Sequence, residues 1–250
     1  MTQPKLLKRI TDMKKYEAIL FDLDGTLLPL DQDEFSKVYF KYLYVSTAAP
    51  LGYQKETFAP AMWKGVSAMV KNDGSRPNAE AFWEVFEAVT GIESKGKSEI
   101  FDEFYRNEFQ MAKEVTRPTP VALEAVRAAK SIADKVVLAT NPLFPAVAQE
   151  SRLGWAGISP DEFCLVTNYQ NSSSCKPNPL YYLDIAKKIG VDPKRCLMIG
   201  NNAQEDVEAS RAAGMEAILI TDCLINEHKE LPDCRCITLA ELPDLLRNGL

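Results

Sequence analysis

The chain has 250 residues and a formal net charge of −6 at pH 7, with 46% hydrophobic and 26% charged residues. This composition is typical of a globular protein and excludes a disordered, collagen-like or coiled-coil chain, while the acidic balance disfavours general binding to nucleic acid or to a membrane surface. The sequence shows no apolar run long enough to span a membrane, no signal peptide and six cysteines without a C-x-x-C pair, so we expect reduced thiols in a cytoplasmic protein.

Short apolar runs alternate with helical patterns through most of the chain. The runs have the character of parallel strands buried on both faces, and they lie at 18–21, 136–139, 163–166, 196–199 and 217–220. The helical patterns between and after them lie at 121–133, 145–153, 179–189 and 203–213. This alternation predicts an α/β fold with a doubly wound parallel sheet, in the manner of a Rossmann-like core.

The stretch 30–118 interrupts the alternation with four helical patterns and no convincing strand. Fifteen of the 23 aromatic residues fall in this stretch. We therefore expect an all-helical domain at 30–118, inserted after the first strand of a core formed by 1–29 and 119–250. Its aromatic residues predict a packed helix bundle, with an aromatic substrate slot as the alternative.

Two carboxylates follow the first strand, at Asp22 and Asp24, and Gly25 comes directly after them. Open parallel sheets bind their ligands at the carboxyl ends of the strands. Carboxylates at this spacing can hold a divalent cation, and one can attack as a nucleophile while the other transfers a proton. An EF-hand is excluded because its sixth position would be Leu27 instead of glycine. A solvated acidic turn is the alternative for this motif alone.

Polar residues also follow the later strands. Thr140 and Asn141 come after 136–139, where a hydroxyl and backbone amides can hold a phosphate oxygen. Lys176 precedes the helix 179–189 and can neutralise a phosphoryl group together with the attacking carboxylate. A fourth group, Asn201, Glu205 and Asp206, follows the strand 196–199. The single histidine, His228, excludes a multi-histidine zinc site. Together these strand ends predict a site for phosphoryl chemistry.

With these motifs in this order, the sequence resembles the haloacid dehalogenase-like hydrolase superfamily. The run Phe21-Asp22-Leu23-Asp24-Gly25-Thr26-Leu27 resembles its first motif, and Thr140, Lys176 and Gly200–Asp206 resemble the second, third and fourth. The helical stretch lies where that family carries its type-1 cap. Members that act on carbon–halogen bonds lack an acid at the position of Asp24, so the resemblance favours a phosphatase.

The resemblance implies a role for each matched residue. Asp22 would attack phosphorus to give an aspartyl-phosphate, and Asp24 would protonate the leaving group and then activate water. Thr140 and Lys176 would orient the phosphoryl oxygens. Mg²⁺ would be held by the Asp22 carboxylate, by the Asp24 backbone carbonyl and by the fourth motif, through Asn201, Asp206 or Glu205.

Position 201 departs from the family pattern, because the residue after the glycine of the fourth motif is usually Asp. An amide oxygen still binds a hard cation, but the site loses one negative charge. We therefore predict that magnesium binding is retained but weakened.

The sequence thus predicts a magnesium-dependent phosphatase that acts on a small phosphorylated metabolite. A phosphomutase and a non-catalytic phospho-ligand binding module weakened by Asn201 are the alternatives. Besides Asn141, the candidates for substrate binding are Tyr39, Lys41 and Arg76 in the helical stretch, where an arginine can pair with a carboxylate or a second phosphate. The sequence leaves the substrate and the oligomeric state open.

The string Gly91-Ile92-Glu93-Ser94-Lys95-Gly96-Lys97-Ser98 matches the P-loop pattern G-x-x-x-x-G-K-S. A P-loop follows a buried strand, whereas the residues 82–89 have helical periodicity. We therefore expect Gly91 to end a helix and not to bind a nucleotide.

Overall fold

The centre of the computed structural model, which describes residues 14–93, 98–228 and 230–249, is a six-stranded sheet. Its strands are β1 (Ala18–Phe21), β2 (Lys135–Leu138), β3 (Leu165–Val166), β4 (Cys196–Gly200), β5 (Glu216–Ile220) and β6 (Arg235–Ile237). They follow the order β3-β2-β1-β4-β5-β6, and each neighbouring pair is parallel. The predicted α/β fold is confirmed, and β1 lies inside the sheet between β2 and β4.

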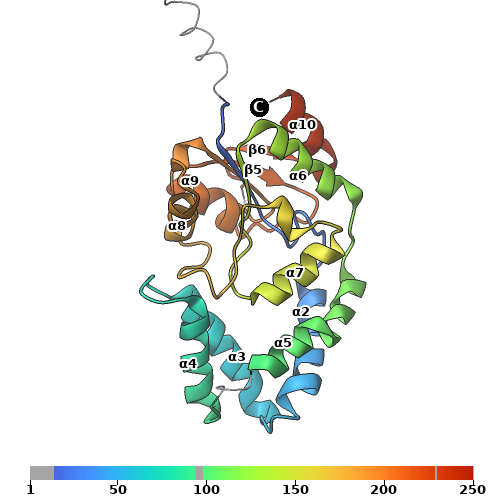
Figure 1. Ribbon diagram of the computed structural model, residues 1–250, viewed down its shortest axis with the longest axis vertical. Coiled ribbons are helices and arrows are strands. Elements are labelled where there is room, and N and C mark those ends of the chain that lie inside the picture. Colours follow the sequence, from blue (N-terminus) through green and yellow to red (C-terminus); the bar gives the residue numbers. More distant parts are fainter. Residues whose placement is uncertain (1–13, 94–97, 229, 250) are drawn as a thin grey trace, which may run out of the picture.

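Helices cover both faces of the sheet, as a doubly wound fold requires (Figure 1). They are α6 (Pro120–Ile132), α7 (Ala146–Trp155), α8 (Pro179–Ile189), α9 (Ala209–Ala212) and α10 (Leu242–Asn248). Ile19 and Phe21 share a hydrophobic cluster with α6, α7 and α10, while Ala18 and Leu20 pack with α8 and α9. Successive residues of β1 thus face opposite layers, and all four are fully buried.

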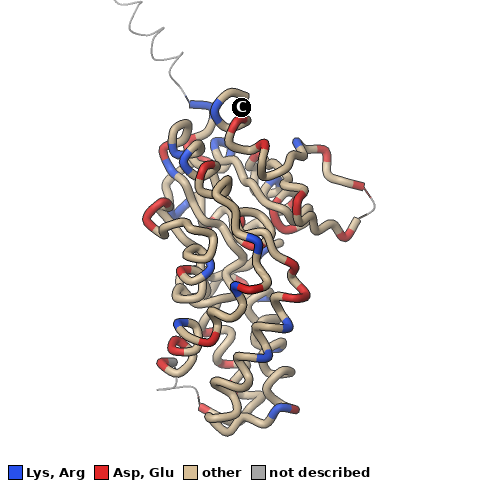
Figure 2. The backbone as a smooth tube through the Cα atoms, turned by 90° about the vertical axis from the view of Figure 1, so that its right-hand side faces the viewer, with Lys and Arg blue, Asp and Glu red and all other residues tan. Residues whose placement is uncertain are grey.

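The residues between β1 and α6 form a helical insert at one end of the molecule (Figure 1). Its helices are α2 (Gln32–Leu43), a π-helical turn (Tyr44–Ala48), α3 (Lys55–Val70), α4 (Asn78–Thr90), α5 (Ser98–Arg106) and a 3₁₀ segment (Glu108–Val115). The chain enters and leaves the insert side by side, since Leu30 forms a bridge with Thr116 and the Arg117 amide donates to the Pro29 carbonyl at 2.8 Å. Figure 2 shows Lys and Arg interspersed with Asp and Glu over the core and the insert.

Several elements differ from the sequence expectation, and α10, which follows the last predicted helix, was not predicted. The three-residue strand β6 was not predicted, because two of its residues are exposed and the strand forms no apolar run. The expected helix 203–213 begins as a π-helical turn over Ala203–Glu208 before it continues as α9.

Gly91 ends α4 in the left-handed conformation, with φ 68°, as predicted for a helix end. The residues 94–97 of the P-loop-like string, Lys97 included, lie outside the described residues. Among the helices of the described ranges, none has the length and apolar character needed to cross a lipid bilayer.

Candidate active site

A polar cavity of about 210 Å³ lies at the carboxyl ends of β1, β2 and β4. It brings together seven residues singled out from the sequence, namely Asp22, Asp24, Thr140, Asn141, Asn201, Glu205 and Asp206. Residues from separate strands meet here because the carboxyl ends of parallel strands share one edge of the sheet. The Asp22 amide, for example, donates to the Ile199 carbonyl of β4 at 2.9 Å and so continues the sheet pairing into the site.

Lys176 joins two of these carboxylates. Its ammonium group donates to Asp22 Oδ1 at 2.8 Å and to Asp206 Oδ1 at 2.6 Å, and its side chain is only 1% exposed. Burial opposes the charge, but the carboxylates of Asp206 and Asp22 outweigh it and raise the pKa of Lys176 well above its usual value. The lysine therefore stays protonated and compensates the negative charge of the site.

Asp24 contacts a cation that the sequence analysis missed. The guanidinium group of Arg152 on α7 forms an ion pair with Asp24 and stacks over the Phe144 ring at 4.4 Å. Arg152 is fully buried. The signal in the sequence is an arginine four residues after Ala148, on the inward face of the helical pattern 145–153.

The second oxygen of Asp24, Oδ1, is buried without a hydrogen-bond partner among the described residues. Burial raises the pKa of the Asp24 carboxyl, although Arg152 opposes the shift. A raised pKa lets a carboxyl hold a proton closer to neutral pH, which suits a general acid.

Asn201 lies against the turn that follows β1. The Thr26 hydroxyl is 3.2 Å from Asp22 Oδ2 and 3.1 Å from Asn201 Oδ1, and Asn201 Nδ2 donates to the Cys223 carbonyl at 2.6 Å. Gly25 makes this approach possible, because its φ is +86° and an added Cβ would lie 2.2 Å from Asn201 Nδ2. The first and fourth motifs are thus in direct contact.

The loop after β2 supplies Thr140 and Asn141. The Thr140 carbonyl accepts hydrogen bonds from the Tyr181 hydroxyl at 2.8 Å and the Thr167 hydroxyl at 2.7 Å, which fix the loop. Asn141 Nδ2 donates to Glu205 Oε2 at 3.1 Å. Asn141 Oδ1 is buried and has no partner in the described part of the chain, so the cavity still offers an unused acceptor.

The donors around the polar cavity are oxygen atoms of carboxylates and amides, which suits a hard divalent cation. The described residues contain no group of three His, Cys, Asp or Glu side chains arranged as a metal site. The amide oxygen of Asn201 is therefore part of what the site offers beside the carboxylates, and the donor chemistry fits a hard divalent cation.

Of the three candidate substrate-binding residues in the helical insert, one lines a cavity and two do not. Tyr39 lines a second, apolar cavity next to the polar one, and its hydroxyl lies 2.9 Å from the Tyr105 hydroxyl. Lys41 lies over the Tyr42 ring at 5.1 Å, and Arg76 is paired with Glu84. Neither Lys41 nor Arg76 lines either cavity.

The model of one protein family, the haloacid dehalogenase-like hydrolases, matches residues 16–214. The chain belongs to this family. Phosphoglycolate phosphatase of Neisseria gonorrhoeae is 26% identical over 207 residues, which are 82% of this chain and 80% of that protein. Hydrolases of this family generally use a divalent metal, and with phosphatases among its relatives this member is a phosphoric monoester hydrolase.

Solved structures of the family agree with the fold. The haloacid dehalogenase-like phosphatase of Thermococcus onnurineus gives a TM-score of 0.60 at 20% identity and covers 93% of this chain and 98% of its own. The 2-haloacid dehalogenase of Pseudomonas syringae gives the same TM-score and identity, with 94% and 100% covered. Because a phosphatase and a dehalogenase match equally well, this likeness shows the fold and not the reaction.

Proposed function

We propose that this hydrolase is a magnesium-dependent phosphatase that works through an aspartyl-phosphate on Asp22. The observation that carries the proposal is that Asp22, Asp24 and Thr140 line one cavity at the carboxyl edge of the sheet, while Lys176 is buried directly behind it against Asp22. An oxygen nucleophile, a partly buried acid and a buried cation close to one another are what phosphoryl transfer needs.

In the first half-reaction, an Asp22 carboxylate oxygen forms the bond to phosphorus while the bond to the leaving oxygen breaks. Asp24 gives its proton to that oxygen, so the alcohol departs neutral. In the second, Asp24 takes a proton from water, whose oxygen attacks phosphorus and releases Asp22 and inorganic phosphate. Lys176 offsets negative charge beside Asp22 in both steps, and Thr140 orients a phosphoryl oxygen.

Asp22, the Asp24 backbone carbonyl, Asn201 and Asp206 are the residues that would hold the magnesium ion. When bound, a divalent cation supplies positive charge that reduces repulsion between the carboxylate and the phosphoryl oxygens. Asn201 contributes an amide in place of a carboxylate, so we keep the prediction that binding is weaker than with an aspartate there.

The test is phosphate release from p-nitrophenyl phosphate by the full chain, with magnesium or with EDTA. We expect turnover that needs magnesium and that falls by about a thousandfold or more in Asp22→Asn, since loss of a nucleophile removes the covalent route. Mass spectrometry of acid-quenched enzyme should find a phosphoryl group on the peptide that contains Asp22.

Asp244→Asn is the matched control, because it removes the same charge from an exposed side chain on α10. Its turnover should equal that of the unmodified chain. Equal rates for Asp22→Asn and the unmodified chain, with both folded by circular dichroism, would contradict the proposed mechanism.

The proposal also retains the cytoplasmic location predicted from the sequence.

A further inference from the structure

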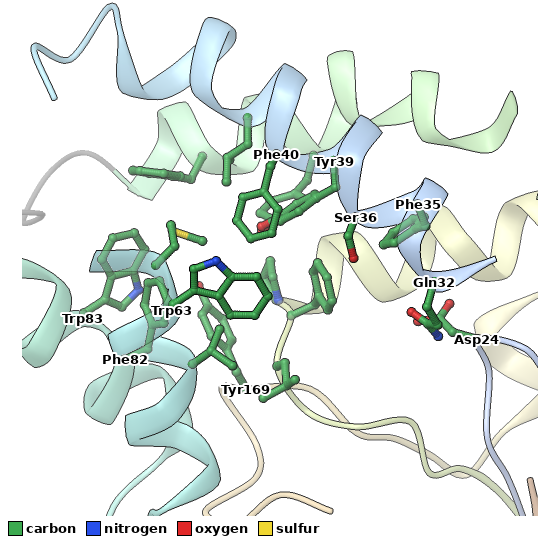
Figure 3. Close-up of a pocket in the computed structure, with 18 residues that line it drawn as sticks. Asp24, Gln32, Phe35, Ser36, Tyr39, Phe40, Trp63, Phe82, Trp83 and Tyr169 are labelled. Atoms are coloured by element: carbon green, nitrogen blue, oxygen red, sulfur yellow. The ribbon is translucent and has the colours of Figure 1, made fainter. Parts of the chain in front are cut away.

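A second cavity lies between the helical insert and the core, next to the polar cavity. This apolar cavity has a volume of about 220 Å³, and Figure 3 shows the residues that line it. Ten of these eighteen residues are aromatic and five are aliphatic. Among the described residues that line it, Asp24 is the only charged one. A dry cavity of about 150 Å³ already accommodates benzene, so this one can hold a larger apolar group.

The two cavities meet at the proposed acid. Asp24, Gln32, Leu143 and Phe144 line both of them. In Figure 3, Asp24 and Gln32 lie at one end of the apolar cavity and Trp83 and Phe82 at the other. Since Asp24 must reach the leaving oxygen, the alcohol part of a substrate bound in the polar cavity begins where the apolar cavity opens.

Apart from Asp24, the polar side chains that line the apolar cavity are Gln32 and Ser36, toward the end where Asp24 lies, and those of its tyrosines and tryptophans. The hydroxyls of Tyr39 and Tyr105 are hydrogen-bonded to each other. Beyond the end that Gln32 and Ser36 line, a sugar or a second carboxylate would therefore be buried with fewer partners than such groups need. The carboxylate of phosphoglycolate would lack a cationic partner in the apolar cavity, because no cationic side chain lines it among the described residues.

Trp63 forms an exposed wall of the same cavity. Its side chain comes from α3 and its ring lies 5.4 Å from that of Phe40 on α2, yet 59% of Trp63 is exposed. Figure 3 shows both rings between Asp24 and Trp83. A large apolar ring at the rim of an apolar cavity gains contact area when an apolar ligand enters.

We propose that the substrate is the phosphate monoester of an apolar alcohol, aliphatic or aromatic, whose carbon skeleton occupies the apolar cavity while its phosphoryl group lies in the polar one. This inference rests on the proposed function, and it names the class of substrate for that reaction. It also disfavours the phosphomutase alternative, because a sugar phosphate would leave its hydroxyls unpaired in the apolar cavity.

The experiment compares kcat/KM for n-alkyl phosphates from ethyl to hexyl, whose leaving groups differ in length but hardly in acidity. Phosphoglycolate and glycerol 1-phosphate are the polar references. We expect kcat/KM to rise about fourfold for each added methylene until the cavity is filled, which is the usual gain from burying that group. The inhibition constants of the n-alkylphosphonates, which are not hydrolysed, should fall in the same proportion.

Trp63→Ala and Val70→Ala form a matched pair on α3. Val70 is 39% exposed and does not line the cavity. We expect Trp63→Ala to reduce the dependence on chain length and Val70→Ala to preserve it. Because both side chains are exposed, neither substitution threatens the fold.

A flat dependence on chain length, or phosphoglycolate as the best substrate, would overturn the inference while leaving the phosphatase intact. Phosphonate binding that strengthens with chain length in a protein without turnover would instead uphold the apolar cavity and contradict the proposed function. The two failures are therefore distinguishable.

Discussion

Both ends of the Asn201 amide group are hydrogen-bonded to neighbouring residues. Its Oδ1 accepts from the Thr26 hydroxyl, and its Nδ2 donates to the Cys223 carbonyl. An aspartate can make the first contact but not the second, since a carboxylate has no donor. The asparagine thus satisfies both neighbours, although it carries no negative charge.

We predict that Asn201→Asp destabilises the metal-free protein and increases its response to magnesium. The lost donor leaves the Cys223 carbonyl unpaired, which costs about 1–3 kcal/mol of unfolding free energy. The added charge should tighten magnesium binding by roughly tenfold, or about 1.4 kcal/mol. The measurement is the melting temperature as a function of magnesium concentration.

Asn202→Asp is the control, because it adds the same charge one residue away. The Asn202 side chain accepts from the amides of Gln204 and Glu205, a role that a carboxylate retains. Equal magnesium responses in the two variants would mean that position 201 is not a ligand.

The sequence can indicate a site residue when its position follows from a strand end, as for Asp22, Asp24 and Thr140. It could not indicate that Arg152 pairs with Asp24, because that contact depends on how α7 packs against the sheet. For Arg76, the sequence places the residue in a loop but does not show that Glu84 is its partner.

At the scale of elements, strands with contiguous apolar runs were predictable and the short edge strand β6 was not. The run 18–21 is buried on both faces, so every residue carries the signal. In β6, two of the three residues are exposed. Its position comes instead from pairing with β5, where Leu219 aligns with Cys236, and such pairing leaves no mark in the sequence.

Helices α3 and α4 of the helical insert pack closely at Gly65. An added Cβ there would lie 2.6 Å from the Phe82 ring, and Phe82 is buried. We predict that Gly65→Ala lowers the free energy of unfolding by about 1–2 kcal/mol, because overpacking outweighs the better helix propensity of alanine. Urea unfolding followed by circular dichroism measures the change.

Gly154→Ala on α7 is the comparison. Nothing lies within 4 Å of its added Cβ, so the substitution changes only the helix propensity. We expect the free energy of unfolding to increase by up to about 1 kcal/mol. A loss of similar size in both variants would show that close packing at Gly65 is not the cause.

At the scale of the whole molecule, we propose 30–118 as a cap that moves on the core. The paired strand-like segments at Leu30 and Thr116 are the hinge in this proposal. The apolar cavity lies between insert and core, so its access depends on their relative position. The helical nature of the insert was predictable from periodicity, whereas its contacts with the core were not, since they depend on how the two parts pack, as for Phe35 against Phe144 and Phe109 against Trp155.

Asn78 at the start of α4 makes polar contacts with the core that can be tested by substitution. Its Nδ2 lies 3.3 Å from the Ser174 carbonyl and 3.2 Å from Cys175 Sγ, directly before Lys176. Its backbone amide donates to the Ser172 carbonyl at 2.8 Å. Asn78 therefore connects the helical insert to the loop that positions the buried lysine.

We predict that Asn78→Ala raises KM by about tenfold, because the loss of the side-chain hydrogen bonds to the core shifts the insert toward positions that leave the cavities open. Small-angle scattering should report a larger radius of gyration without substrate. Asn72→Ala is the matched control, since Asn72 donates to Asn78 Oδ1 and to the Arg76 carbonyl and so loses contacts only within the insert. If both variants raise KM equally, the effect comes from the stability of the insert, and Asn78 does not restrain its motion.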